Sequence, residues 1–178
     1  LQAFGFSFFM QFFQVYLIKQ YDFSQVQIGQ MFGYIGIWIA ITQGGITRLV
    51  SKRFSSPQIL QVTLLGLSLS LWLILGPSAL WMLFVTQPLV ALFQGLSQPN
   101  LTSIVSVLTP KDTQGEILGI QQSVQSLAFA IPPIIAGVVV SIDVRLPIFL
   151  AGLSIFIAWL VFVFGFRSAL YTQKVEGN

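Results

Sequence analysis

Charged residues divide this chain into long apolar stretches. No Asp, Glu, Lys or Arg occurs in residues 1–18, 23–47, 54–110, 117–142 or 146–166. A helix that spans a bilayer needs roughly 20 apolar residues, so 54–110 is long enough for two, and Gly76-Pro77-Ser78 marks a turn between them. The pattern therefore predicts an all-α protein with six membrane-spanning helices. Their ranges are 1–18, 26–47, 57–75, 80–106, 115–141 and 146–166, followed by a tail at 167–178.

Glutamines inside four of these spans lie on shared helix faces, since side chains three or four residues apart point the same way at about 100° per residue. A buried amide without a partner costs about 1–3 kcal/mol or more. We therefore expect the first, second, fourth and fifth spans to surround a polar cavity. The alternative is that the amides join neighbouring helices by hydrogen bonds. The cavity candidates are Gln11, Gln14, Gln30, Tyr34, Gln94, Gln98, Gln121 and Gln125.

The third and sixth spans are poorer in amides. The third has Gln58 and Gln61 only at one end, and the sixth has no Gln or Asn, so we expect both to face lipid. The first span contains the run "FGFSFFMQFF", residues 4–13. Its aromatic rings would suit a partly aromatic, amphipathic solute beside Gln11 and Gln14, or else they face lipid.

Composition supports a membrane protein and excludes several kinds of chemistry. Of the 178 residues 55% are hydrophobic and only 7% are charged, against about 25% charged in soluble domains. The chain has no Cys and no His, so disulfides and the usual zinc and haem ligands are absent. No Asp, Glu, Lys or Arg lies deep in a predicted span. We therefore expect no enzymatic activity, no cofactor and no metal.

Basic residues predict the orientation, because cytoplasmic loops are enriched in Lys and Arg. With six alternating spans, six of the eight basic residues fall on one side. The loops at 48–56 and 107–116 and the C-terminus are then cytoplasmic, and the protein is placed in the cell membrane. The net charge of +3 reflects this orientation rather than nucleic-acid binding. The six are Arg48, Lys52, Arg53, Lys111, Arg167 and Lys174; the other two are Lys19 and Arg145.

Three stretches resemble one family. They are "QGGITRLVSKRF" (residues 43–54), "QGLSQPNLTSIVSVLTPKDTQGEILG" (94–119) and "QQSVQSLAFAIPPIIAG" (121–137). Together they resemble the C-terminal half, helices seven to twelve, of a major facilitator superfamily transporter. The closest similarity is to the drug/proton antiporter branch that includes tetracycline efflux proteins. The chain starts "LQAF", without Met, and we expect it to be part of a longer polypeptide.

The resemblance implies a secondary transporter that exports a small amphipathic solute by alternating access. Its partners would be the bilayer, the solute, and an N-terminal six-helix half or another membrane protein that completes the cavity. The alternative is a non-transporting scaffold or assembly subunit on the same fold. Charge contacts in the family's cytoplasmic loops imply a gate role for Arg48, Lys52, Arg53, Asp112 and Glu116, although such charges are also common as solvated topology markers.

Pro132 and Pro133 in the fifth span are predicted to bend it, because proline removes a backbone hydrogen bond and clashes with the preceding turn. A bent helix can close over a site at the membrane midplane when two halves of a transporter rock. The alternative is a static kink filled by packing.

Overall fold

A computed structural model describes residues 1–76 and 79–176 of the chain. Every regular element in these residues is helical, which confirms the all-α prediction. Each predicted span falls on a helix, and the second is divided among α2, η1 and α3. The elements are α1 (Gln2–Tyr21), α2 (Gln25–Ile41), η1 (Thr42–Ile46), α3 (Thr47–Ser51), α4 (Ser56–Ile74), α5 (Leu80–Leu108), α6 (Gln114–Ile142) and α7 (Leu146–Glu176).

Two short connections are built by local hydrogen bonds. Asp22 ends α1 in the left-handed conformation, with φ 53° and ψ 36°, and its N–H donates toward the carbonyls of Ile18 and Leu17. Ser24 then begins α2 with a capping box: the Ser24 N–H donates to Gln27 Oε1 at 2.8 Å, and the Gln27 N–H donates to Ser24 Oγ at 3.4 Å. This reciprocal pair satisfies two N–H groups that a helix start leaves free.

The helix that begins with α2 is interrupted by one turn of π-helix, η1. Thr42 Oγ1 donates to the Trp38 carbonyl at 2.8 Å, and Thr47 Oγ1 donates to the Thr42 carbonyl at 2.9 Å. Thr42 is fully buried against Gly95 of α5, where a Cβ would lie 2.9 Å from Thr42 Cγ2. The close contact with α5 therefore anchors the π turn, a feature that is frequent at functional sites.

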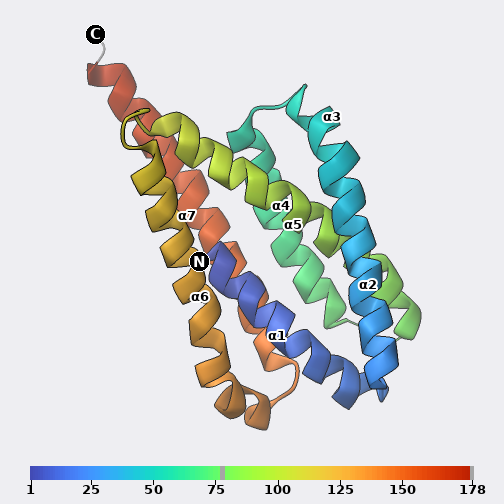
Figure 1. Cartoon of the computed structure of the whole chain (residues 1–178). Helices are drawn as coiled ribbons and strands as arrows, with labels where there is room; N and C mark the ends of the chain where they lie inside the picture. Colours follow the sequence, from blue (N-terminus) through green and yellow to red (C-terminus); the bar gives the residue numbers. More distant parts are fainter. Residues whose placement is uncertain (77–78, 177–178) are drawn as a thin grey trace.

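Packing joins the helices into two groups that lie side by side. Figure 1 shows α1, α6 and α7 together, with α2, α4 and α5 beside them, and α4 connects the groups by packing on both α5 and α7. Glycines permit these approaches. A Cβ at Gly66 of α4 would lie 2.5 Å from the Phe93 ring, and one at Gly5 of α1 would lie 2.7 Å from the Ala151 carbonyl oxygen.

The Phe-rich run of α1 forms part of the core. Phe8, Phe9, Phe12 and Phe13 are between 0% and 3% exposed, and the Phe9 and Phe13 rings lie 4.9 Å apart. Both sequence interpretations, a solute surface or a lipid surface, are therefore wrong for these four rings. Burial of large aromatic side chains between helices is favourable wherever the packing is tight.

Among the described residues, three helices are long and apolar enough to cross a membrane by length and composition: α4, α5 and residues 146–165 of α7. Half of α4 is buried, against 22% of the α7 stretch. The expectation that the third and sixth spans are both peripheral therefore describes α7 better than α4. The reason is the leucine face of α4, which includes Leu60, Leu67 and Leu71 and packs between α5 and α7.

Candidate functional site

A row of polar side chains runs along α5 at four-residue intervals: Gln94, Gln98, Thr102 and Ser106. Each of them is hydrogen-bonded to a glutamine of another helix, and we name these eight side chains the amide row. Gln2 Nε2 donates to Gln94 Oε1 at 3.0 Å, Gln98 Nε2 donates to Gln125 Oε1 at 3.0 Å, Gln121 Nε2 donates to Thr102 Oγ1 at 3.3 Å, and Gln114 Nε2 donates to the Ser106 hydroxyl.

The partners of α5 in this row run antiparallel to it. Three come from α6 and the fourth, Gln2, comes from the first turn of α1. The backbones of α5 and α6 approach each other far less than those of α4 and α5 do. The long amide side chains therefore bridge two helices that are otherwise separated, and the candidate residues Gln94, Gln98, Gln121 and Gln125 lie in one strip.

Amides in the row keep unused hydrogen-bonding capacity. A glutamine has two donor hydrogens and an acceptor oxygen with two lone pairs. Gln94, Gln98, Gln121 and Gln125 are all partly exposed, and each makes one hydrogen bond in the row. Gln121 Oε1 is buried without a partner among the described residues. The strip can therefore both donate to and accept from a further polar group.

Gln11 and Gln14 extend the polar surface along α1. Gln11 is exposed, and its Nε2 donates to the Phe129 carbonyl of α6 at 3.3 Å and to Ser7 Oγ at 3.4 Å. Gln14 is partly exposed. Gln11 is therefore held between α1 and α6, the two helices that supply the partners of the row.

The structure places Gln30 and Tyr34 away from the row, between α2 and the beginning of α5. Gln30 is exposed and lines a pocket of about 190 Å³ together with Gln27 and Phe84. The Tyr34 hydroxyl donates to the Phe84 carbonyl at 2.9 Å, and the two rings lie 5.7 Å apart. These two candidates are thus part of the α2–α5 contact.

Gln87 is a polar residue that the candidate list from the sequence leaves out. It lies on α5 one residue before Pro88 and is 0% exposed. Neither Gln87 Nε2 nor Gln87 Oε1 has a hydrogen-bond partner among the described residues. Spacing alone places Gln87 on the face of Gln94 and Gln98, and that periodicity is the signal that identifies it.

The five charged candidates all lie at the surface. Arg48 belongs to α3, and Lys52 and Arg53 follow it; all three are exposed, as are Asp112 and Glu116. Glu116 lies in the first turn of α6, where a carboxylate is favoured by the helix dipole. In the part of the chain that the structure describes, none of the five forms an ion pair. Their gate role therefore stays a prediction.

Proline occurs in the interior of two long helices, α5 and α6. Pro132 is buried within α6, which runs without interruption from Gln114 to Ile142. The side chain of Pro133 lies outside the described residues. In α5, Pro99 is followed by Asn100, whose Nδ2 donates to the Leu96 carbonyl at 2.8 Å. The Asn100 amide thus bonds a carbonyl in the turn that the proline disturbs.

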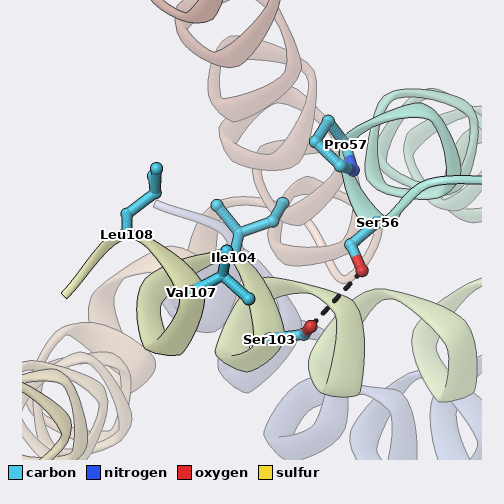
Figure 2. A pocket seen from close by; sticks show the side chains of 6 residues that line it. All are labelled: Ser56, Pro57, Ser103, Ile104, Val107 and Leu108. Carbon is cyan, nitrogen blue, oxygen red and sulfur yellow. Dashed lines mark hydrogen bonds between the residues drawn. The ribbon is translucent and has the colours of Figure 1, made fainter. Parts of the chain in front are cut away.

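A small pocket of about 230 Å³ lies where α4 begins and α5 ends. Figure 2 shows Ser56 and Ser103 pointing toward each other from these two helices, with Ile104, Val107 and Leu108 on the α5 side. The two hydroxyl oxygens are 3.4 Å apart and form a hydrogen bond. Its polar groups thus satisfy each other, and the pocket offers mainly apolar surface.

Two helix faces carry small residues with nothing packed on them. A Cβ at Gly29, Gly33 or Gly36 of α2, or at Gly115 or Gly119 of α6, would meet no atom of the described residues within 4 Å. The three α2 glycines fall within about 60° around the helix axis. Small residues in such a pattern permit close approach of another helix in membranes. We name the α2 and α6 surfaces the two glycine faces.

The described residues contain no cluster of three or more His, Cys, Asp or Glu side chains that would gather around a metal ion. A comparison with protein families finds that the model described as Major Facilitator Superfamily matches residues 1–176. No curated protein matches the chain.

Proposed function

We propose that this chain, which belongs to the major facilitator superfamily of membrane transporters, is the C-terminal six-helix half of a secondary active transporter. The transporter exports a small amphipathic solute in exchange for an ion, by alternating access. The amide row lines this chain's side of the central cavity. The observation that carries the proposal is the row itself: partly exposed amides from α1, α5 and α6 in one strip, with hydrogen-bonding capacity left over.

Amides suit a solute that is polar at one end and apolar at the other. They donate and accept without a fixed charge, so they can exchange their bonds with each other for bonds to a solute. Exchange within the row costs little, because hydrogen bonds between membrane helices contribute on average about 0.6 kcal/mol. The backbones of α5 and α6 approach each other little, so a solute that breaks the bond between Gln98 and Gln125 would disturb few other contacts between these helices.

A second six-helix half would cover the surfaces that this chain leaves open. In hydrocarbon, polar groups without partners are costly, and amides of the row are partly exposed. The two glycine faces offer close approach for helices of that half. No Asp, Glu, Lys, Arg or His lies within residues 23–47, 54–110 or 117–142. Intramembrane charges are the usual coupling sites, so the coupling group belongs to the second half.

Transport measurements on the complete transporter test the solute site. In vesicles with a panel of amphipathic solutes, the double variant Gln98→Ala/Gln125→Ala should lower transport at least about tenfold, the effect of losing about 1.4 kcal/mol of binding. Gln25→Ala, at the exposed start of α2, is the matched control and should transport normally. Equal transport by the double variant and the control would contradict the assignment of the row.

Association of the two halves tests whether a second half covers the open surfaces of this chain. The two halves are expressed as separate polypeptides and co-purified. Gly33→Leu should reduce the yield of the complex, because the side chain fills the space that a partner helix needs. The same change at Gly165, which lies on α7 and also has no described neighbour within 4 Å, should leave the yield unchanged. Undiminished association of the Gly33 variant would exclude the α2 glycine face as the contact.

A further inference from the structure

The largest of the pockets described for this chain lies between α3, α4 and α5 and has a volume of about 590 Å³. Sites for small molecules typically occupy about 300–1,000 Å³. Its wall is mainly apolar and includes Phe93 and Leu96 of α5. Phe54 and Val62, which also line it, are 55% and 65% exposed. The pocket therefore opens along the outer face of α4, on a surface that a hydrocarbon chain can reach.

Polar groups in this pocket come from α4. Gln58 and Gln61 line it and are exposed. Gln58 Oε1 accepts from the Ser55 N–H at 3.0 Å as part of a capping box, which fixes the side chain. Gln61 makes no hydrogen bond to a described residue. The pocket thus combines an apolar wall with amide donors near the start of α4.

Cations flank the pocket. Lys52 and Arg53 lie in the chain between the lining residues Val50 and Phe54, and both are exposed. They form no ion pair in the part of the chain that the structure describes. No Asp or Glu occurs between Asp22 and Asp112 in the sequence, so this segment has no carboxylate of its own to neutralise them.

We infer that this pocket binds an anionic glycerophospholipid. One acyl chain lies against Phe93, Leu96 and Val62, the amides bond the glycerol ester oxygens, and Lys52 and Arg53 bind the phosphate. Basic pockets between membrane helices on the cytoplasmic side are suited to acidic headgroups. The site lies on the outer face of α4, away from the amide row, so it is a lipid site and not part of the solute pathway.

The smaller pocket in Figure 2 lacks this combination. Its hydroxyls on Ser56 and Ser103 bond each other, and it has no amide in its lining. The pocket beside Gln30 has amides, but the charged residue next to its lining in the sequence is an acid, Asp22, which precedes Phe23. Of these three pockets, only the one between α3, α4 and α5 offers an apolar wall, amides and cations together.

Lipid competition tests the inference. The purified protein is equilibrated in micelles with equal amounts of phosphatidylglycerol and phosphatidylcholine, and the bound lipid is counted by native mass spectrometry. Phosphatidylglycerol should be retained preferentially. The double variant Lys52→Gln/Arg53→Gln should reduce this preference about 20- to 30-fold, because a basic residue at an anionic surface contributes about fivefold. Lys111→Gln, an exposed residue of another loop, should leave it within twofold.

The apolar part needs its own variant. Val62→Trp fills the pocket mouth and should abolish preferential retention, whereas Leu69→Trp, exposed on the same helix but outside the pocket, should not. Glycerol 3-phosphate in solution should displace little lipid, since it lacks an acyl chain. Equal retention of both lipids, no effect of the cation or Val62 variants, or full displacement by glycerol 3-phosphate would each overturn the inference. The experiment measures only bound lipid, so its result is independent of the transport proposal.

Discussion

Replacing Gln87 by methionine should stabilise the protein. Gln87 is 0% exposed, and its amide nitrogen and oxygen have no partner among the described residues. A buried group of this kind costs about 1–3 kcal/mol. Methionine has a similar length, is flexible and carries no amide. We therefore expect Gln87→Met to raise the free energy of unfolding by about 1–3 kcal/mol.

The same change at Gln98 should act in the opposite direction. Gln98 Nε2 donates to Gln125 Oε1 at 3.0 Å, so Gln98→Met removes a hydrogen bond and leaves Gln125 Oε1 without its donor. Such bonds between membrane helices contribute about 0.6 kcal/mol on average and at most about 1.7 kcal/mol. The two variants lie on one helix face and differ in whether the amide has a partner. Opposite signs are therefore the expected result.

Unfolding in mixed micelles with increasing denaturing detergent, followed by the fluorescence of the four tryptophans, measures both changes. If Gln87→Met lowers the free energy of unfolding by more than about 1 kcal/mol, the reasoning is refuted, because the amide must then have a stabilising partner. If the variant is more stable but transports more slowly, Gln87 is kept for function at a cost in stability, as is common for site residues.

Three further outcomes are expected. Gly5→Ala should destabilise the fold by about 1–3 kcal/mol, because a Cβ there lies 2.7 Å from the Ala151 carbonyl oxygen. Gly33→Ala in this chain alone should be neutral or up to about 1 kcal/mol stabilising. Thermal unfolding measures both changes. A cysteine at Ser55 should react with an impermeant thiol reagent only from the cytoplasmic side. Labelling from outside intact cells would contradict the predicted topology. Liposomes containing this chain alone should show no ion-driven solute accumulation, and robust accumulation would place the coupling site within it.

The positions of the helices follow from the sequence because charge and turn residues interrupt the apolar runs. Asp22 ends α1 and is visible in the sequence as a charge, and Ser24 begins α2 and is visible as a helix cap. The π turn at Thr42–Ile46 could not be predicted in this way. It depends on the contact between Thr42 and Gly95, two residues that are far apart in the chain, and the periodicity of one helix holds no information on its neighbour.

The rest of the candidate site depends on which helices pack against each other, and the sequence pattern does not predict this. Spacing places Gln94 and Gln98 on one face of α5 and Gln121 and Gln125 on one face of α6, but it does not say which helix each face meets. The structure pairs Gln98 with Gln125, and Gln94 with Gln2 of α1. Gln2 is absent from the candidates because its importance depends entirely on where the first turn of α1 lies.

The six predicted spans differ in helix length and composition. Among the described residues, α4, α5 and residues 146–165 of α7 are long and apolar enough to cross a membrane. The other three long segments, α1, the one that begins with α2, and α6, carry Gln11, the two glycine faces and most partners of the amide row. A helix that faces lipid on every open side gains from each apolar residue, whereas a helix that faces a second half or a cavity does not. α2 has only 17 residues before the π turn, and α6 is on average as hydrophobic as α5. Helix length and the positions of the glutamines, rather than low hydropathy, therefore distinguish these segments, and the partner half stays a prediction.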